Sequence, residues 1–474
     1  MGLENIRHSA RIGLTALIVA VGIPASAAAE TLADAMASAY DHRGLLQQNR
    51  ALLRAADEDV AVAISGLRPI VNWTANATRT AQRFRSNTTT GGLIDSTSAT
   101  TASVGLSLDL VLYDAGRTRM GVDAAKEAVL ATRQALLGVE QNIFLQVVQA
   151  YMDVRSATEI VALRRNNVRV LTEELRAAKD RFEVGEVTRT DVAQSEARLA
   201  ASRSALVQAE GDLAVAREFY AFAVGHRPNR LAPPAPTPSS ARSLQDAKAI
   251  AMRNHPEMLR VKHAVAAADI NAGIAKAQEA PKISLTSRIG LQDTVGNNNF
   301  SESASVGIEM SGPIYQGGKI SALQRQAIAR RDAERANLHE VRANIAQNVG
   351  NAFAQIQVAR AARDASQRQI RAAQVAFRGV REEATLGART TLDVLNAEQE
   401  LLDAKAGLIT ATSNETVASY SLLASMGLLT AEHLNLNVKQ YDPAAYYNMV
   451  KTAPTRMSKQ GQKLDRVLRA LGKQ

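Results

Sequence analysis

The chain has 474 residues, of which 46% are hydrophobic, 22% are charged and only 4% are aromatic. This balance is typical of long packed helices and argues against a disordered chain or a large aromatic-rich core. The absence of cysteine excludes disulfides, thiolate zinc sites, thiol nucleophiles and lipid attachment through an N-terminal cysteine. The seven histidines are scattered and form no His-Glu-x-x-His pair, so we expect neither a metal site nor a cofactor.

Residues 1–29 are predicted to be a secretory signal peptide. Arg7 and Arg11 precede an apolar run over residues 12–23, and Ala27–Ala29 offers a small-residue cleavage site. The run is too short for a membrane span, which needs roughly 20 residues. Much of the net charge of +10 lies at the C-terminal end. Because nucleic acid is not the expected partner of an exported chain, we expect this basic end to be a solvated or disordered tail.

The mature sequence contains two copies of one unit. Residues 102–225 match residues 304–427 at a constant offset, which pairs Gly185 with Gly387. Upstream a slightly larger offset pairs Asp57 with Asp269. The predicted divisions after the signal peptide are a first repeat over 30–226, a Pro-rich linker over 227–243, a second repeat over 244–428, and a C-terminal segment with a basic tail over 429–474.

Each repeat is predicted to contain a helix, two strands, a long helix, a turn and a further helix. The first helix of the first copy is expected near residues 32–66. The long helices run from about Arg117 to Phe182 and from about Lys319 to Ala384, without a proline. At about 1.5 Å per residue each would be on the order of 100 Å long. Two shorter helices stacked end to end could pack beside such a rod, so the unit is expected to be an elongated bundle. Charges recur along the rods, so they cannot span lipid.

The strands are predicted by alternation of apolar and polar residues. Val104, Leu106 and Leu108 share one face, and Ser103, Gly105 and Ser107 lie on the other; three further segments repeat this pattern. Four amphipathic strands in an exported chain favour a membrane β-barrel. One chain cannot close it, because such barrels begin at about eight strands. An ordinary soluble sheet packed against the helices is the alternative.

The turns that end the long helices carry matching residues. Gly185 and Gly387 suit helix ends that need a positive φ. Thr188 with Asp191, and Thr390 with Asp393, then form Thr-x-x-Asp starts of the next helices. Capping alone is a sufficient reason for both acids.

The mature chain resembles the TolC family of outer-membrane efflux proteins, of the type without a lipid anchor. The resemblance is carried by the duplication, by the turns Tyr113–Arg117 and Tyr315–Lys319, by the segment Leu386–Asn396 and by Tyr441–Pro443. It implies a mainly α fold with a membrane β-barrel: a homotrimer whose 12-stranded barrel takes four strands from each protomer and sits in outer-membrane lipid, continued by an α-helical barrel across the periplasm.

The resemblance also implies a function. The trimer would be the passive exit duct of a tripartite efflux or type I secretion system, gated at its periplasmic helix tips. Its partners would be a periplasmic adaptor and an inner-membrane ABC or proton-driven transporter. Because that transporter selects the cargo, drug, metal and protein remain open as cargo.

The same resemblance assigns roles at the tips. Asp393 matches an aspartate that forms a charged ring at the periplasmic entrance, and a second ring position holds Asn396, which implies a less negative entrance. Arg389 matches an arginine whose links to the neighbouring tip, at the positions of Thr190 and Asp191, keep the tunnel shut. The residues expected to meet the adaptor are Gly185, Glu186 and Val187 in the first tip and Leu386, Gly387 and Ala388 in the second.

Two other classes of protein fit the sequence less well. An enzyme is not expected, because no nucleophile elbow or zinc motif is present and the glycines before Lys319 lack the remaining residues of a phosphate-binding loop. A periplasmic adaptor-like helical protein without its own pore is the alternative, but duplicated rods with paired strands favour the channel.

Overall fold

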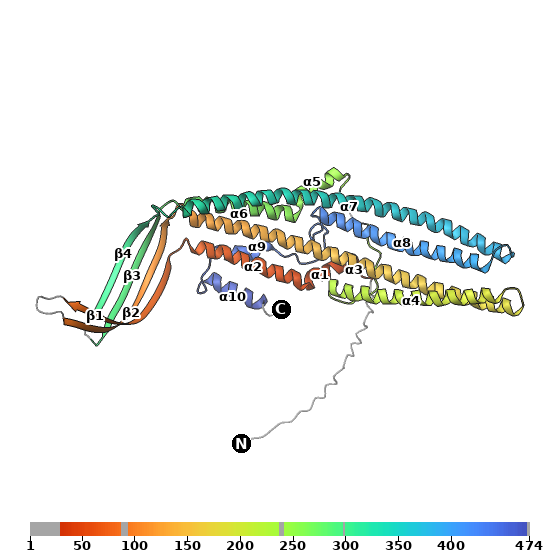
Figure 1. Cartoon of the computed structure of the whole chain (residues 1–474), viewed down its shortest axis with the longest axis horizontal. Coiled ribbons are helices and arrows are strands. Elements are labelled where there is room, and N and C mark those ends of the chain that lie inside the picture. Colours follow the sequence, from red (N-terminus) through yellow and green to blue (C-terminus); the bar gives the residue numbers. More distant parts are fainter. Residues whose placement is uncertain (1–28, 87–92, 237–240, 297–298, 472–474) are drawn as a thin grey trace, which may run out of the picture.

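The computed structural model describes residues 29–86, 93–236, 241–296 and 299–471. The molecule is an elongated helical bundle with a sheet at one end (Figure 1). The predicted signal peptide, except for its last residue, lies outside these ranges, as do residues 237–240 of the predicted linker. Among the described residues, no helix is both long and apolar enough to cross a membrane.

Two helices of 67 residues run along most of the molecule: α3 (Arg117–Glu183) and α7 (Lys319–Thr385). From their far ends, α4 (Arg189–Val224) and α8 (Thr391–Ser425) return antiparallel. Figure 1 shows the two resulting hairpins side by side, with both tips at the end opposite the sheet. The predicted long helix, turn and further helix are therefore confirmed in both copies.

The single helix predicted near residues 32–66 is wrong, because the chain breaks at Arg43. Arg43 has φ −69° and ψ 114°, which is extended backbone. The second repeat breaks at His255, where the following Pro256 disfavours a helical conformation. The shorter helices are therefore two per repeat: α1 (Leu32–His42), α2 (Gly44–Ser65), α5 (Leu244–Asn254) and α6 (Pro256–Ala277). As expected, helices stack end to end beside a long one: α2 packs along one half of α3 and α4 along the other (Figure 1).

Four strands form one antiparallel sheet in the order β1-β2-β3-β4. Trp73 lies opposite Leu106, which lies opposite Ile289, so the register brings apolar residues of adjacent strands to one face. The predicted alternation is thus confirmed, and β1 and β4 are the two edges of the sheet. The strands are β1 (Ile70–Ser86), β2 (Leu93–Tyr113), β3 (Lys282–Val295) and β4 (Asn299–Ser311).

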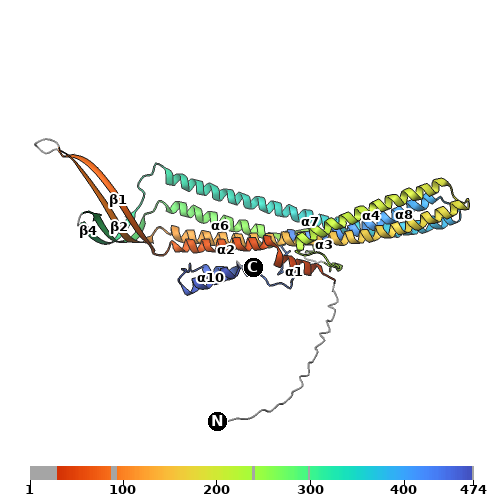
Figure 2. The ribbon, with the colours of Figure 1, turned by 90° about the horizontal axis from the view of Figure 1, so that it is seen from below.

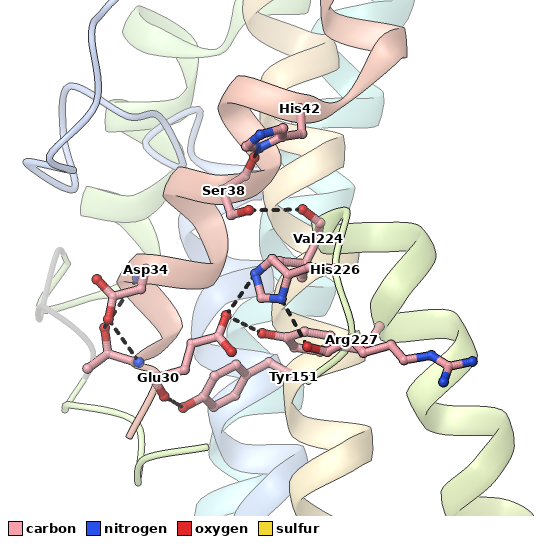
Figure 3. Close-up of polar contacts among 10 residues, drawn as sticks. Glu30, Asp34, Ser38, His42, Tyr151, Val224, His226 and Arg227 are labelled. Carbon is pink, nitrogen blue, oxygen red and sulfur yellow. Dashed lines mark hydrogen bonds and ion pairs between the residues drawn. The ribbon is translucent and has the colours of Figure 1, made fainter. Parts of the chain in front are cut away.

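The main hydrophobic cluster takes residues from α1, from the middle of α3 and from the last turns of α4, and Figure 3 shows how Glu30 is held beside it. The hydroxyl of Tyr151 donates to the Glu30 carbonyl oxygen at 2.9 Å, and the hydroxyl of Tyr220 donates to the Glu30 carboxylate at 2.7 Å. The His226 ring nitrogen lies 3.3 Å from the same carboxylate. Both tyrosine rings are fully buried. The start of α1 is therefore fixed against α3 and α4.

The described C-terminal segment is helical rather than the disordered tail that was one of the two expectations, while its basic side chains over residues 451–471 are solvated as the other expectation had it. Residues 443–450 form α9 (Pro443–Val450), and residues 459–471 form α10 (Lys459–Leu471), which lies along α2 (Figure 2). Tyr446, Val450 and Leu464 bury their side chains against Ala61 of α2. The tail is ordered because its few apolar residues are buried in this cluster. Its basic composition alone does not indicate such packing.

Candidate functional site: the helix tips

Both hairpin tips turn through the same backbone path. Gly185 has φ 79° and Gly387 has φ 75°, a region that residues with a side chain seldom adopt. The Glu186 amide donates to the carbonyl of Arg181 at 2.9 Å, and the Ala388 amide donates to the carbonyl of Glu383 at 3.0 Å. Each bond satisfies one of the free carbonyls in the last turn of α3 or α7, as the two glycines led us to expect.

The predicted capping boxes are both present. The Thr188 amide donates to the Asp191 carboxylate at 2.9 Å, and the Thr390 amide donates to the Asp393 carboxylate at 3.0 Å. Each threonine hydroxyl accepts in return from the aspartate's own amide. The hydrogen bonds from Thr390 hold the pKa of Asp393 below its usual value, and those from Thr188 do the same for Asp191. Both acids are therefore charged at neutral pH within a single chain.

Arg389 is engaged within its own tip. Its Nε donates to Glu383 Oε2 at 2.8 Å, and this bond raises the pKa of the guanidinium. Thr190 is exposed in the first turn of α4. The expected links from Arg389 to Thr190 and Asp191 of a neighbouring tip stay a prediction. Any such link must compete with Glu383, which sequence reasoning missed although it lies only six residues before Arg389.

Asn396 joins the two hairpins of one chain. Its side-chain oxygen accepts from Arg198 Nη2 of α4 at 2.9 Å. Next to this bond, Leu171, Leu199 and Leu395 form a small buried cluster between the hairpins. The family resemblance places Asn396 at a ring position and names no partner for it. The structure adds its contact with Arg198.

Further from the tips, a cleft of about 310 Å³ lies between α3, α7 and α8. Burial, and then the nearby Glu174 carboxylate, raise the pKa of Glu398 in this cleft to about 7. Arg381 lies 4.0 Å from Glu174 and acts in the opposite direction on Glu398. Sequence reasoning did not find this site, because the burial of Glu398 and its approach to Glu174 depend on how α3 and α8 pack.

Each tip presents an exposed apolar side chain at its outermost turn. Leu386 is 85% exposed, and Val184 occupies the equivalent place in the first tip with 73% exposed. Leu386 was among the residues expected to contact an adaptor. Val184 was not, although the offset between the repeats places it opposite Leu386. The neighbouring Gly185, Glu186, Gly387 and Ala388 are exposed, and Val187 is half-buried.

The architecture is that of outer membrane channels. The CmeC outer membrane channel of Campylobacter jejuni superimposes with a TM-score of 0.73 over 90% of each chain, at 16% identity. This likeness shows the fold, and it confirms the predicted class, mainly helical with four strands per chain.

Sequence comparisons show the family. The profile described as "Outer membrane efflux protein" matches residues 36–226 and 249–428, so the chain belongs to the outer membrane efflux protein family. The outer membrane efflux protein BepC of Brucella suis is 38% identical over 428 residues, 90% of this chain and 91% of BepC. The outer membrane protein TolC of Vibrio cholerae is 24% identical over 427 residues, 85% of this chain and 92% of TolC.

These matches confirm the predicted resemblance and the predicted location. The chain is an outer-membrane protein that extends into the periplasm, and its family is one of channels rather than enzymes.

Proposed function

We propose that three copies of this chain assemble into a channel through the outer membrane that continues as a helical duct into the periplasm. The open sheet carries this proposal. β1 and β4 are edges, and an unpaired strand edge is unstable in lipid unless another strand pairs with it. Four strands are too few to close a barrel of this kind, and three copies supply twelve.

The chemistry of the sheet supports a lipid-facing surface. Trp73, Val306 and Ile308 lie on one face and are 73%, 75% and 71% exposed. Large apolar side chains at this exposure are unfavourable in water and favourable against hydrocarbon. An adaptor-like protein without a pore would have to bury this face against another protein.

We also propose that the trimer is the exit duct of a tripartite efflux or type I secretion system. Val184 and Leu386 would offer apolar contacts to a periplasmic adaptor at the tips. An inner-membrane ABC or proton-driven transporter would select the cargo and supply the energy, while the duct itself stays passive.

The tips would form the gate. Three copies of Asp393 would make a ring of carboxylates that favours cations, with Asn396 leaving out the second ring of charge. Within each chain, the 2.9 Å hydrogen bond from Arg198 Nη2 to Asn396 Oδ1 joins the two hairpins. Movement of α7 and α8 away from α3 and α4 would break this bond, so it would help to hold the resting state.

The test is single-channel conductance of the purified protein in planar bilayers, with its mass measured by light scattering. Discrete cation-selective openings from a trimer, with lower selectivity in Asp393→Ala, would support the proposal. A water-soluble monomer without channel activity would overturn it and leave the adaptor-like protein.

A separate variant tests whether the hydrogen bond between Arg198 and Asn396 helps to keep the channel closed. We expect Asn396→Ala to raise the open probability, because it removes the bond from Arg198. Gln399→Ala is the matched control, since the Gln399 amide bonds only to Asp403 within α8. Equal behaviour of the two variants would contradict the role given to Asn396.

A further inference from the structure

The C-terminal residues form a strongly basic surface. Residues 451–471 contain six Lys or Arg and a single acid, Asp465. The acid lies 3.8 Å from Arg456 and so offsets one of these six charges. The exposed basic residues are Lys451, Arg456, Lys459, Lys463, Arg466 and Arg469. We call residues 451–463, which carry the first four, the basic turn.

Arg68 fixes the basic turn at the foot of the sheet. Its guanidinium donates to the carbonyl oxygen of Ala453 at 2.7 Å and also to that of Thr452. Arg68 precedes Ile70, the first residue of β1, by only two positions. The basic turn therefore lies where the helical part meets the strands, and α10 leads back from it along α2 (Figure 2).

Aromatic residues mark the same level of the molecule. Trp73 near the start of β1, Tyr113 at the end of β2 and Tyr315 after β4 are 73%, 51% and 88% exposed. Trp and Tyr gather at membrane interfaces, where an apolar ring meets hydrocarbon and a polar group meets headgroups. With the sheet in the membrane, these rings place the basic turn at headgroup depth.

The turn is built to hold its position. The Gln460 amide donates to the Met449 carbonyl oxygen at 2.8 Å. A Cβ added at Gly461 would lie 2.1 Å from the Thr455 carbonyl oxygen, so only glycine fits this packing. At the tip of this ordered turn, Met457 is 90% exposed.

We propose that the basic turn binds the headgroups of anionic phospholipids in the inner leaflet of the outer membrane, with Met457 entering the boundary of the acyl chains. The inference rests on the proposed channel, which places the sheet in lipid. Basic residues near an anionic surface are each attracted to it, and an apolar side chain beside them adds burial. The occupant is a lipid surface because the charge lies at the level of the strand ends.

The test uses the full chain in nanodiscs of phosphatidylcholine alone or with about one third phosphatidylglycerol. Hydrogen exchange is measured on peptides covering residues 451–463. We expect exchange to be roughly tenfold slower in the anionic discs, and the difference to disappear in about 1 M salt.

Variants separate the basic turn from general charge. Changing Lys451, Arg456, Lys459 and Lys463 to Gln should abolish the lipid dependence. Arg466→Gln with Arg469→Gln, which removes charge further along α10, should keep it. All six side chains are exposed, so folding should be retained, and the trimer is checked by light scattering.

Equal exchange in both kinds of disc, whether fast or slow, would overturn the inference. Loss of the lipid dependence in the Arg466 and Arg469 variant would also overturn it. These results would leave a conducting trimer intact, whereas a chain that inserts into neither disc would overturn the channel proposal and this inference with it.

Discussion

The two long helices have the same length and the same turns, but their surroundings differ. Seventeen residues of α3 are buried in the single chain, against four of α7. The reason is position: α3 packs against α1, α2 and α4 of its own repeat and against α6 and α8 of the second, while α7 lies at the edge of the bundle and packs mainly against α5, α6 and α8 of its own repeat (Figures 1 and 2). A duplicated sequence therefore does not produce a duplicated environment, and the exposed face of α7 is suited to contact another copy.

One ion pair occurs in both repeats and shows the same contrast. Asp269 lies 2.9 Å from Arg335 with both side chains half exposed. Its counterpart Asp57 lies 4.0 Å from Arg133 and is fully buried. The C-terminal segment covers only the first pair, with the ring of Tyr447 5.3 Å from the Arg133 guanidinium. Burial raises the pKa of Asp57 to about 6, although Arg133 opposes it.

The largest expected effect concerns the exposed face of α7. Val358 and Val375 are 61% and 62% exposed and stand where the first repeat has Ser156 and Glu173. Val358→Asp with Val375→Asp should bury charge at the interface between copies and cost at least about 4 kcal/mol of assembly free energy. Light scattering should then show monomers. Ser156→Asp in α3 is the control, and a trimer that survives the α7 variant would contradict this use of the face.

The second-largest expected effect is the free-energy cost of breaking the buried ion pair, which should exceed the cost of breaking the exposed one. Arg133→Met leaves Asp57 buried without its cation and should cost about 1.5 kcal/mol at pH 7, because a carboxyl whose pKa is about 6 limits the loss by binding a proton. Arg335→Met removes an exposed pair and should cost less than about 1 kcal/mol. The free energies of opening of α2 and α6, measured by hydrogen exchange, check this. Equal costs would mean that the C-terminal segment does not change the strength of the pair.

The two tips should behave alike. Thr188→Ala and Thr390→Ala each remove one side of a capping box, and each should cost about 1 kcal/mol in the first turn of α4 or α8. Serine at either position should restore most of it. Hydrogen exchange in those turns is the readout. A much smaller loss at Thr390 would indicate that Arg389 and Glu383 hold the second tip without the cap.

The smallest effect depends on pH. Because the pKa of Glu398 is raised from 4.5 to about 7, the folded hairpins bind its proton more tightly than the unfolded chain does. Its stabilising contribution is therefore lost as pH rises from about 5 to about 7. Glu398→Gln should stabilise the hairpins by about 1 kcal/mol at pH 8, allowing for solvent screening, and leave them unchanged at pH 5.

The matched control is Glu196→Gln at the equivalent place in α4, where Glu196 pairs with Lys179 at 2.9 Å on the surface. It should change stability by less than about 0.5 kcal/mol at either pH. A pH-independent effect of Glu398→Gln would contradict the role given to burial and Glu174.

The sequence by itself was sufficient for the features that depend on near neighbours along the chain. Alternation predicted the strands, glycine predicted the turns at Gly185 and Gly387, and the threonine-aspartate spacing predicted both capping boxes. These succeed because side chains two to four residues apart decide local backbone geometry. The duplication followed from comparing the chain with itself.

Tertiary structure alone decided the features that join distant segments. The hydrogen bond between Arg198 and Asn396 joins residues 198 positions apart in the chain. Asp57 is buried beside Arg133, which the C-terminal segment covers with Tyr447, and that segment lies outside both repeats. Likewise, Leu464 of α10 is buried in a cluster with Tyr446 and Val450 of α9 and Ala61 of α2. Because composition and periodicity carry no information about which surfaces meet, neither the partner of Asn396 nor the raised pKa of Glu398 could be read from the chain before it was folded.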